Sequence, residues 1–161
     1  MPEPFDNENT SFLILDIARL LRAEFERKVA SACLGVTPSE ARTLAHVARH
    51  GPLRQRDLAD LTGLGAMSIT TCLDRLESAG LVRRECDPSD RRAKLVSASA
   101  EATPLLMQLK RIGEEVRGIT RDSIEPDDWE AFHRMLKTAR DNHLRSHQTR
   151  HTAEGHEHDT D

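Results

Sequence analysis

The chain is poor in aromatic residues and in cysteine. Tyrosine is absent, tryptophan occurs once, and aromatic residues make up 3% of the 161 positions. The three cysteines show no paired spacing, which suits a reducing compartment rather than a disulfide framework. No stretch approaches the roughly 20 apolar residues of a membrane helix, and the acidic start lacks the apolar segment of a secretory signal. We therefore expect a cytoplasmic protein without membrane contact.

Motifs of enzyme chemistry are also missing. The sequence has no glycine-rich phosphate loop, no nucleophile elbow and no metal-hydrolase motif. The carboxylates are scattered over expected helix faces, as on a solvated surface. We therefore expect no enzyme activity and no cofactor.

A helix-turn-helix pattern occupies residues 55–80. A short amphipathic helix should end near Gly63, and a second helix should run from Ala66 to Ala79 before Gly80. The apolar residues of the second helix fall at helical spacing: Ile69, Cys72, Leu73 and Leu76. Its opposite face carries Met67, Ser68, Thr70, Thr71, Asp74 and Arg75. Such a face can lie in a DNA major groove, but an ordinary helical hairpin with a solvated face gives the same pattern.

A basic hairpin follows these two helices. Residues 81–86 and 94–98 can pair as strands around the turn residues 87–90, which read Asp-Pro-Ser-Asp. Arg91 and Arg92 should lie at the tip, where a protruding hairpin can reach a minor groove. Asp90 can orient Arg91 through a charge-assisted hydrogen bond. A solvated turn with mutually neutralising charges is the alternative, but the order of elements favours a winged helix-turn-helix that binds double-stranded DNA.

These motifs resemble those of MarR-family transcriptional regulators over residues 10–145. The resemblance is carried by Leu-Asp-Arg-Leu-Glu at 73–77, Gly-Leu-Val at 80–82 and Asp-Pro-Ser-Asp-Arg-Arg at 87–92. It implies a homodimeric regulator on a pseudo-palindromic operator, with repression relieved by a small, often aromatic or phenolic, ligand. It also implies that Arg75 holds the DNA backbone and that Arg91 enters the minor groove.

The predicted DNA-contacting set combines the start of the first helix, the second helix and the wing. Its members are Arg54, Gln55, Met67, Ser68, Thr70, Thr71, Arg75, Asp90, Arg91, Arg92 and Lys94. The chain has a formal net charge of −4, and residues 51–99 hold eight cations and seven anions. Affinity must therefore depend on the placement of individual arginines and on dimerisation.

Several positions depart from the family pattern, including Ala102, where a glycine is common. Arg54 replaces the usual Thr or Ser, so the short helix should lack a side-chain cap. Gly65 and Ala66 replace a Ser-Pro helix entry, and Thr71 replaces a frequent arginine. Pro104 suits a first helical turn, so the following helix should begin as late as Thr103 or be kinked.

The terminal helices predict the remaining architecture, which is mainly α with a small β-wing. Residues 11–34 hold apolar residues on more than one face: Phe12, Leu13, Ile14, Leu15, Ile17, Leu20, Leu21 and Phe25. Such an excess favours a symmetric homodimer over a monomer with a larger core. We expect a disordered N-terminus at 1–10, dimerisation helices at 11–36 and 100–147, the winged helix-turn-helix domain at 37–99, and a disordered His-rich tail at 148–161.

Sensor chemistry is weakly encoded. His46 and His50 are candidates for an effector cavity, although surface histidines are the simpler interpretation. His143, His147 and His151 share one face of a continued helix and are weak metal candidates. Cys72 should be a core residue, Cys33 lies near the end of the first helix, and Cys86 lies beside basic residues that can lower a thiol pKa.

Three alternatives therefore remain beside the ligand-responsive regulator. The first two are a redox-responsive regulator that uses cysteine and a metal-responsive regulator that uses histidine. The third, from a different class, is a winged helix that binds proteins instead of DNA. The presence of Arg75, Arg91 and the whole wing favours DNA.

Overall fold

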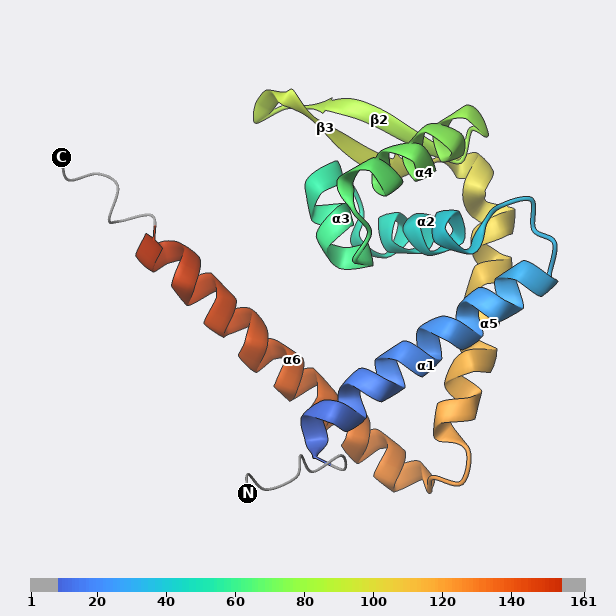
Figure 1. The fold of residues 1–161 in the computed structure, drawn as a ribbon, viewed down its shortest axis with the longest axis vertical. Helices are drawn as coiled ribbons and strands as arrows, with labels where there is room; N and C mark the ends of the chain where they lie inside the picture. Colours follow the sequence, from blue (N-terminus) through green and yellow to red (C-terminus); the bar gives the residue numbers. More distant parts are fainter. Residues whose placement is uncertain (1–8, 155–161) are drawn as a thin grey trace, which may run out of the picture. The chain divides into compact units, whose positions relative to one another are not determined.

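A computed structural model describes residues 9–154, without the side chains of Arg91 and of residues 147–154 (Figure 1). The chain divides into two units, Met1–Ile119 and Thr120–Asp161, and each is described by itself. The elements are α1 (Thr10–Ser31), α2 (Pro38–His50), β1 (Leu53–Arg54), α3 (Gln55–Thr62), α4 (Ala66–Ser78), β2 (Val82–Asp87), β3 (Asp90–Ala98), a 3-10 turn (Ala100–Ala102), α5 (Thr103–Arg121) and α6 (Pro126–Glu154). The order of helices and strands in the first unit is that of a winged helix-turn-helix.

Local caps set the helix boundaries around the helix-turn-helix. Thr37 and Glu40 form a complete capping box at the start of α2. Arg54 occupies the N-cap position of α3 without a side-chain cap, as predicted, and Gly63 ends α3 with a left-handed φ of 66°. Gly65 provides the N-cap of α4, so the helix starts where the sequence predicts.

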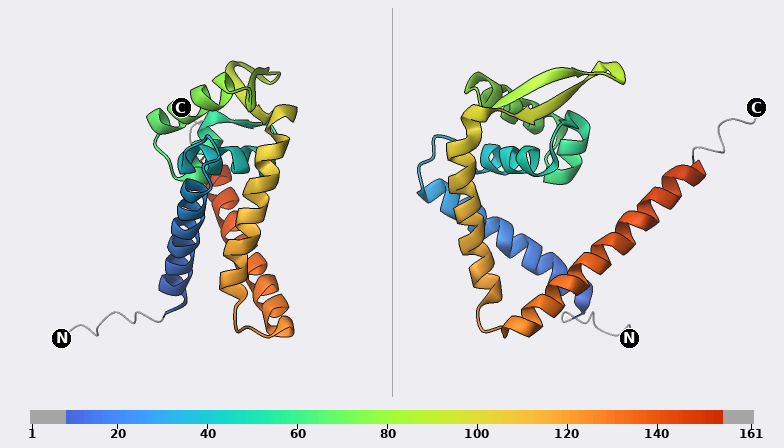
Figure 2. Two further views of the ribbon diagram at one scale, coloured as in Figure 1. Left: turned by 90° about the vertical axis from the view of Figure 1, so that its right-hand side faces the viewer. Right: turned by 180° about the vertical axis from the view of Figure 1, so that it is seen from behind.

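The wing is a three-stranded antiparallel sheet in the order β1-β3-β2. Val82 pairs with Ala98 and Cys86 with Lys94, while Leu53 of β1 pairs with Val96. Strand β2 has the predicted length but lies one residue later, β3 begins four residues earlier than predicted, and β1 was not predicted at all. Figure 2 shows the β2–β3 hairpin extending beyond α3 and α4, so its turn projects from the helical part of the unit.

The core of the first unit lies where these helices meet the sheet. The residues with no more than 1% exposure include Leu44, Leu58, Ile69, Leu73, Leu76 and Val96. The predicted inner face of α4 is therefore confirmed, including buried Cys72. This packing fixes one face of α4 against α2 and α3 and leaves the opposite face in solvent.

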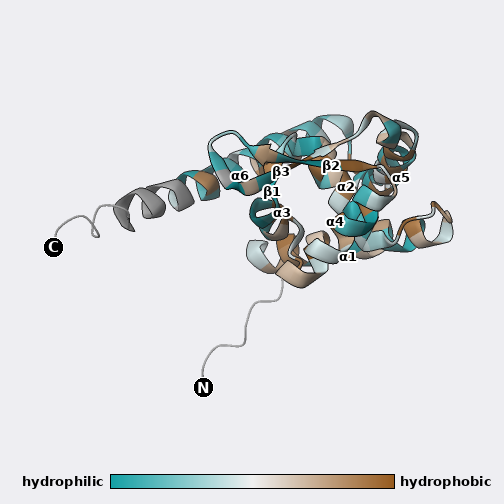
Figure 3. Ribbon diagram, turned by 90° about the horizontal axis from the view of Figure 1, so that it is seen from above, coloured by the Kyte–Doolittle hydropathy of each residue, from teal (hydrophilic) through white to brown (hydrophobic). Residues whose placement is uncertain are grey.

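The long helices differ in length from the prediction. Asn9 caps α1, which ends at Ser31 and not at Gly35, because the Ala32 amide bonds back to Lys28 and Val29 and Cys33 turns left-handed with a φ of 48°. The hydropathy colouring of Figure 3 shows hydrophobic residues along α1, and Leu15 and Leu20 are 65% and 55% exposed.

The helix that follows the wing starts at Thr103 after a 3-10 turn, as the position of Pro104 predicts. In the second unit, α6 continues to Glu154 because no glycine or proline interrupts it before Gly155. The predicted tail at 148–161 therefore begins as helix, and residues 1–8 and 155–161 lie outside the described residues. Whether a dimer forms through the terminal helices stays a prediction.

Candidate nucleic-acid interface

The solvent face of α4 is polar except at its first turn. Met67 is 86% exposed, and Ser68, Thr70 and Thr71 are exposed beside it. The Thr70 and Thr71 hydroxyls donate to the carbonyls of Ala66 and Met67 at 2.9 and 3.0 Å. Each hydroxyl keeps acceptor capacity beyond this bond, which is what contacts to base edges require.

Gln55 joins α3 to this face. Its Nε2 donates to Thr70 Oγ1 at 2.7 Å, so the first residue of α3 and the middle of α4 are linked directly. The structure thus brings Gln55 together with the predicted residues of α4. It also leaves the Gln55 carboxamide oxygen without any described partner among residues 9–146.

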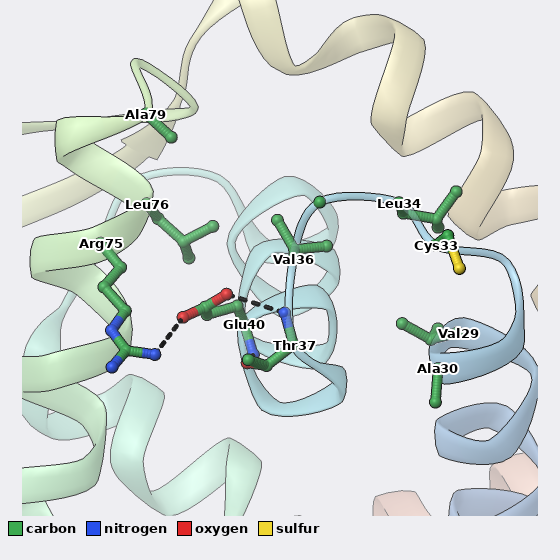
Figure 4. Close-up of a pocket in the computed structure, with 11 residues that line it drawn as sticks. Val29, Ala30, Cys33, Leu34, Val36, Thr37, Glu40, Arg75, Leu76 and Ala79 are labelled. Atoms are coloured by element: carbon green, nitrogen blue, oxygen red, sulfur yellow. Dashed lines mark hydrogen bonds and ion pairs between the residues drawn. The ribbon is translucent and has the colours of Figure 1, made fainter.

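Arg75 is held at the edge of the same helix. Its side chain is 66% exposed, and Nη1 lies 3.4 Å from Glu40 Oε1. Glu40 is buried, and its other oxygen accepts from the Thr37 amide at 2.8 Å (Figure 4). The α2 cap therefore orients a cation that remains accessible. The sequence reveals Glu40 as a capping residue, but it does not reveal this second contact.

The wing turn is organised around Asp87, which the sequence analysis treated only as a turn residue. Its Oδ1 accepts from the Ser89 hydroxyl at 2.6 Å and the Ser89 amide at 2.8 Å, and its Oδ2 accepts from Arg54 Nε at 2.8 Å. The Ser89 hydroxyl and amide, together with Arg54, lower the pKa of Asp87 to about 2. Asp87 is therefore a charged and nearly buried anchor of the hairpin.

Asp90 contacts other groups than the one predicted for it. Its Oδ1 accepts from the Arg92 amide at 3.0 Å, and its Oδ2 lies 3.9 Å from Arg54 Nη1. The predicted contact with Arg91 stays a prediction because that side chain lies outside the described residues. Arg92 and Lys94 are exposed two residues apart on β3, so they share one face of the strand.

A second ion pair joins the base of the wing to α4. Arg84 Nη2 lies 2.6 Å from Asp74 Oδ1, and Arg84 Nε lies 3.7 Å from Glu77 Oε2. The Arg84 side chain is 13% exposed, so it is enclosed between strand and helix. Sequence reasoning missed this pair, since Asp74 had no signal beyond its place on the polar face of α4. Cys86 is exposed on the same strand.

A hollow of about 420 Å³ lies between the end of α1, the α1–α2 loop and the end of α4 (Figure 4). Its apolar wall includes Val29, Leu34, Val36 and Leu76, and Arg75 and Glu40 stand at one side with Cys33 at the other. A cation beside an apolar wall suits a small apolar anion.

The predicted effector histidines lie elsewhere. His46 and His50 do not line the hollow, because they project from the later turns of α2 and stack on each other with ring centroids 5.9 Å apart. Burial, followed by the charges of His50 and Arg49, lowers the pKa of His46.

The described residues provide neither a metal site nor a membrane-spanning helix. No group of three His, Cys, Asp or Glu side chains there could hold a metal ion. His143 is in that part of the chain, but the side chains of His147 and His151 are outside it. In the same part of the chain, no helix has the length and apolar character to cross a membrane. Burial raises the pKa of the Cys72 thiol, which fits a core residue.

Comparison with known proteins supports the family resemblance of the winged region. A model described as the MarR family matches residues 34–93, which include the α2 cap, α3, α4 and the wing turn. Over these residues the chain is similar to the MarR family. The uncharacterised HTH-type transcriptional regulator YcgE of Bacillus subtilis (strain 168) is 32% identical over 98 residues, which are 61% of this chain and 60% of that protein. The match thus spans less than two thirds of YcgE.

Solved structures of regulators share the fold. A crystal structure of MarR superposes with a TM-score of 0.74 at 20% identity, over 91% of this chain and 99% of that one. The transcriptional regulator PA3341 superposes with a TM-score of 0.69 at 29% identity, over 85% of this chain and 99% of that one. BpsR of Bordetella bronchiseptica superposes with a TM-score of 0.64 at 19% identity, over 86% of this chain and 98% of that one. The DNA binding of BpsR is regulated by 6-hydroxynicotinic acid. The winged-helix fold of this chain is thereby confirmed, and YcgE and PA3341 are named as transcriptional regulators.

Proposed function

We propose that this chain is a MarR-family, sequence-specific, double-stranded DNA-binding transcriptional regulator of the cytoplasm. The observation that carries the proposal is the exposed face of α4, with Met67, Ser68, Thr70 and Thr71 in solvent, next to a hairpin anchored at both its base and its turn. In this proposal α4 enters the major groove and the wing arginines enter the minor groove.

The direct test is selection of duplexes from a randomised pool, followed by a mobility shift with unrelated competitor DNA. We expect a pseudo-palindromic consensus with half-sites about 10 bp apart, centre to centre. A matched variant, Thr70→Ala with Thr71→Ala, should lose the consensus but keep the fold. Failure to enrich any sequence, with binding to a protein partner instead, would favour the interaction-module alternative.

The proposed regulator acts as a homodimer. Apolar residues along α1 are exposed in the single chain, including Leu13, Ile14, Leu15, Ile17 and Leu20. Contiguous apolar surface of this kind marks an interface. Two copies related by a two-fold axis would also present two recognition helices to a pseudo-palindrome.

The proposed effector is a small aromatic or phenolic anion that releases a repressor from DNA. The hollow beside Arg75 supports this part, because a ligand carboxylate there would compete with phosphate for the same guanidinium. We therefore propose effector contacts from the α1–α2 loop in place of His46 and His50.

Calorimetric titration with 6-hydroxynicotinic acid and benzoate would test the hollow. Ala30→Trp should fill it and abolish the heat of binding, while Ala23→Trp, farther up α1, should not. Equal heats for both variants would place any ligand elsewhere. A response to oxidants or to zinc, lost on substituting cysteine or histidine, would instead favour the redox or metal alternative.

A further inference from the structure

Arg54 occupies a helix-capping position without serving as a cap. A guanidinium has only donors, so it cannot accept a hydrogen bond from the first amides of α3, and no side-chain cap is present there. The backbone of Arg54 is nevertheless fixed, because it pairs with Leu95 of β3 and leads directly into Gln55 of α3. The side chain thus starts from a rigid junction between the sheet and the helix-turn-helix.

The side chain reaches the turn of the wing. Nε and Nη2 lie 2.8 and 2.7 Å from the same oxygen of Asp87, and Nη2 lies 3.3 Å from Ser89 Oγ. The second oxygen of Asp87 accepts from the Ser89 amide and hydroxyl. The Asp87 side chain is 8% exposed, so Arg54 and Ser89 together surround a nearly buried carboxylate.

The contact falls at the point where the hairpin can bend. The pairing of β2 with β3 shifts register between Cys86 and Asp87, and such an irregularity bends and twists a strand. Arg54 therefore holds the residue next to the bend and, through it, sets the direction of everything beyond, including Arg92.

We infer that Arg54 is a positioning residue that aims the wing, and not a DNA contact as its place in the sequence suggests. This inference rests on the proposed DNA-binding function. The Arg54 side chain is 31% exposed, and three of its neighbours are wing-turn side chains, those of Asp87, Ser89 and Asp90. A guanidinium with these partners directs the hairpin so that Arg91 and Arg92 reach the minor groove while α4 occupies the major groove.

The test uses two forms of one duplex selected by the wild-type protein. The half-sites are the same in both, and the flanks are all A·T in one and all G·C in the other, because minor-groove width and potential depend on that choice. Arg54→Ala, Arg54→Lys, Arg91→Ala and the double variant Arg54→Ala with Arg91→Ala are titrated over a range of salt concentrations. The control is Arg56→Ala, since Arg56 is 76% exposed and pairs only with neighbouring Asp57 among the described contacts.

If Arg54 aims the wing, Arg54→Ala loses about tenfold in affinity on the A·T flanks and about twofold or less on the G·C flanks. The double variant then loses no more of the A·T preference than Arg91→Ala alone. Arg54→Lys also loses the preference, because lysine keeps the charge but lacks the planar fork that reaches Asp87 and Ser89 together.

A phosphate contact would give the opposite pattern and overturn the inference. Both duplexes would lose affinity equally, the salt slope would fall by about 1 per subunit, and lysine would restore binding. A lower melting temperature with an unchanged A·T preference would also overturn it, since that is the result of a merely structural role. If the wild-type protein enriches no duplex, the proposed function itself fails. If it does and Arg54→Lys behaves like Arg56→Ala, only the inference fails.

Discussion

Arg84 Nη2 on β2 lies 2.6 Å from Asp74 Oδ1 on α4, and this ion pair joins the base of the wing to the proposed recognition helix. Together with the contact between Arg54 and Asp87 at the turn, this pair holds the hairpin at two points along its length. Arg54 and Arg84 are positively charged, but their guanidinium groups pair with carboxylates of the fold. Residues 51–99 can therefore have almost no net charge and still present Arg75, Arg92 and Lys94 to solvent.

The neighbouring residues Arg83 and Arg84 provide a matched stability test. Arg84→Ala should lower the free energy of unfolding by about 1–2 kcal/mol, because it removes a largely buried side chain and its charge-assisted hydrogen bond. Arg83 is 63% exposed and lies 3.7 Å from the equally exposed Glu101, so Arg83→Ala should cost less than about 0.5 kcal/mol. Urea unfolding of both variants checks this, and equal losses would contradict the enclosed role of Arg84.

Acid should weaken the wing through Asp87. Its pKa falls from 3.8 to about 2 in the folded chain, so the carboxylate contributes stability that is fully present above pH 3.8 and is lost as pH falls through about 2. Asp87→Asn should therefore be less stable than the wild type at neutral pH, and the difference should shrink across that window. Urea unfolding at a series of pH values measures it.

The control for this acid effect is Asp60→Asn, since Asp60 is exposed on α3. The free energy of unfolding of Asp60→Asn should stay close to that of the wild type throughout the pH series. If the difference in free energy of unfolding between Asp87→Asn and the wild type stays constant down to the lowest pH, loss of the ionised carboxylate is not the reason that the variant is less stable.

Local patterns were sufficient to predict the helices and the turn of the winged region. The periodicity of Ile69, Leu73 and Leu76 predicts α4, and the chemistry of residues 87–90 predicts the turn without reference to the rest of the chain. Strand β1 has only two residues and exists through its pairing with Val96 and Leu95 of β3. A two-residue segment gives no periodic signal, so its strand could not be predicted.

Side-chain contacts between residues far apart in the sequence could not be predicted either, because they leave no local pattern. Arg54 and Asp87 are 33 residues apart, and their meeting depends on how the hairpin twists over α3. His46 and His50 were assigned to a cavity from their residue type alone. The hollow lies instead at the other end of α2, because its walls come from the α1–α2 loop and α4.

Arg75 should contribute to DNA affinity through charge alone. Its side chain is 66% exposed at the edge of α4, one turn beyond Thr71, where the guanidinium can meet phosphate. Arg75→Ala should weaken binding to all sequences alike and lower the slope of log affinity against log salt by about 1 per subunit. The melting temperature should barely change.

Arg117→Ala is the control for this salt titration. Arg117 is 62% exposed on α5 and lies 3.9 Å from Glu114, away from the proposed interface. Its slope should match that of the wild type. An unchanged slope for Arg75→Ala would remove Arg75 from the phosphate contacts and leave it as the partner of Glu40.

The exposed apolar side chains of α1 predict an obligate homodimer. Light scattering should give a particle of twice the 18.1 kDa chain mass. Leu15→Glu with Leu20→Glu places two carboxylates at positions that are 65% and 55% exposed in the single chain. Burying unpaired charges in an apolar interface is costly, so this variant should dissociate or aggregate. Leu61→Glu makes the same chemical change on α3, at a residue that is 43% exposed, and should remain dimeric. If the wild-type protein stays at the mass of one chain at micromolar concentration, or if the α1 variant dimerises as well as Leu61→Glu, the apolar face of α1 is not the interface.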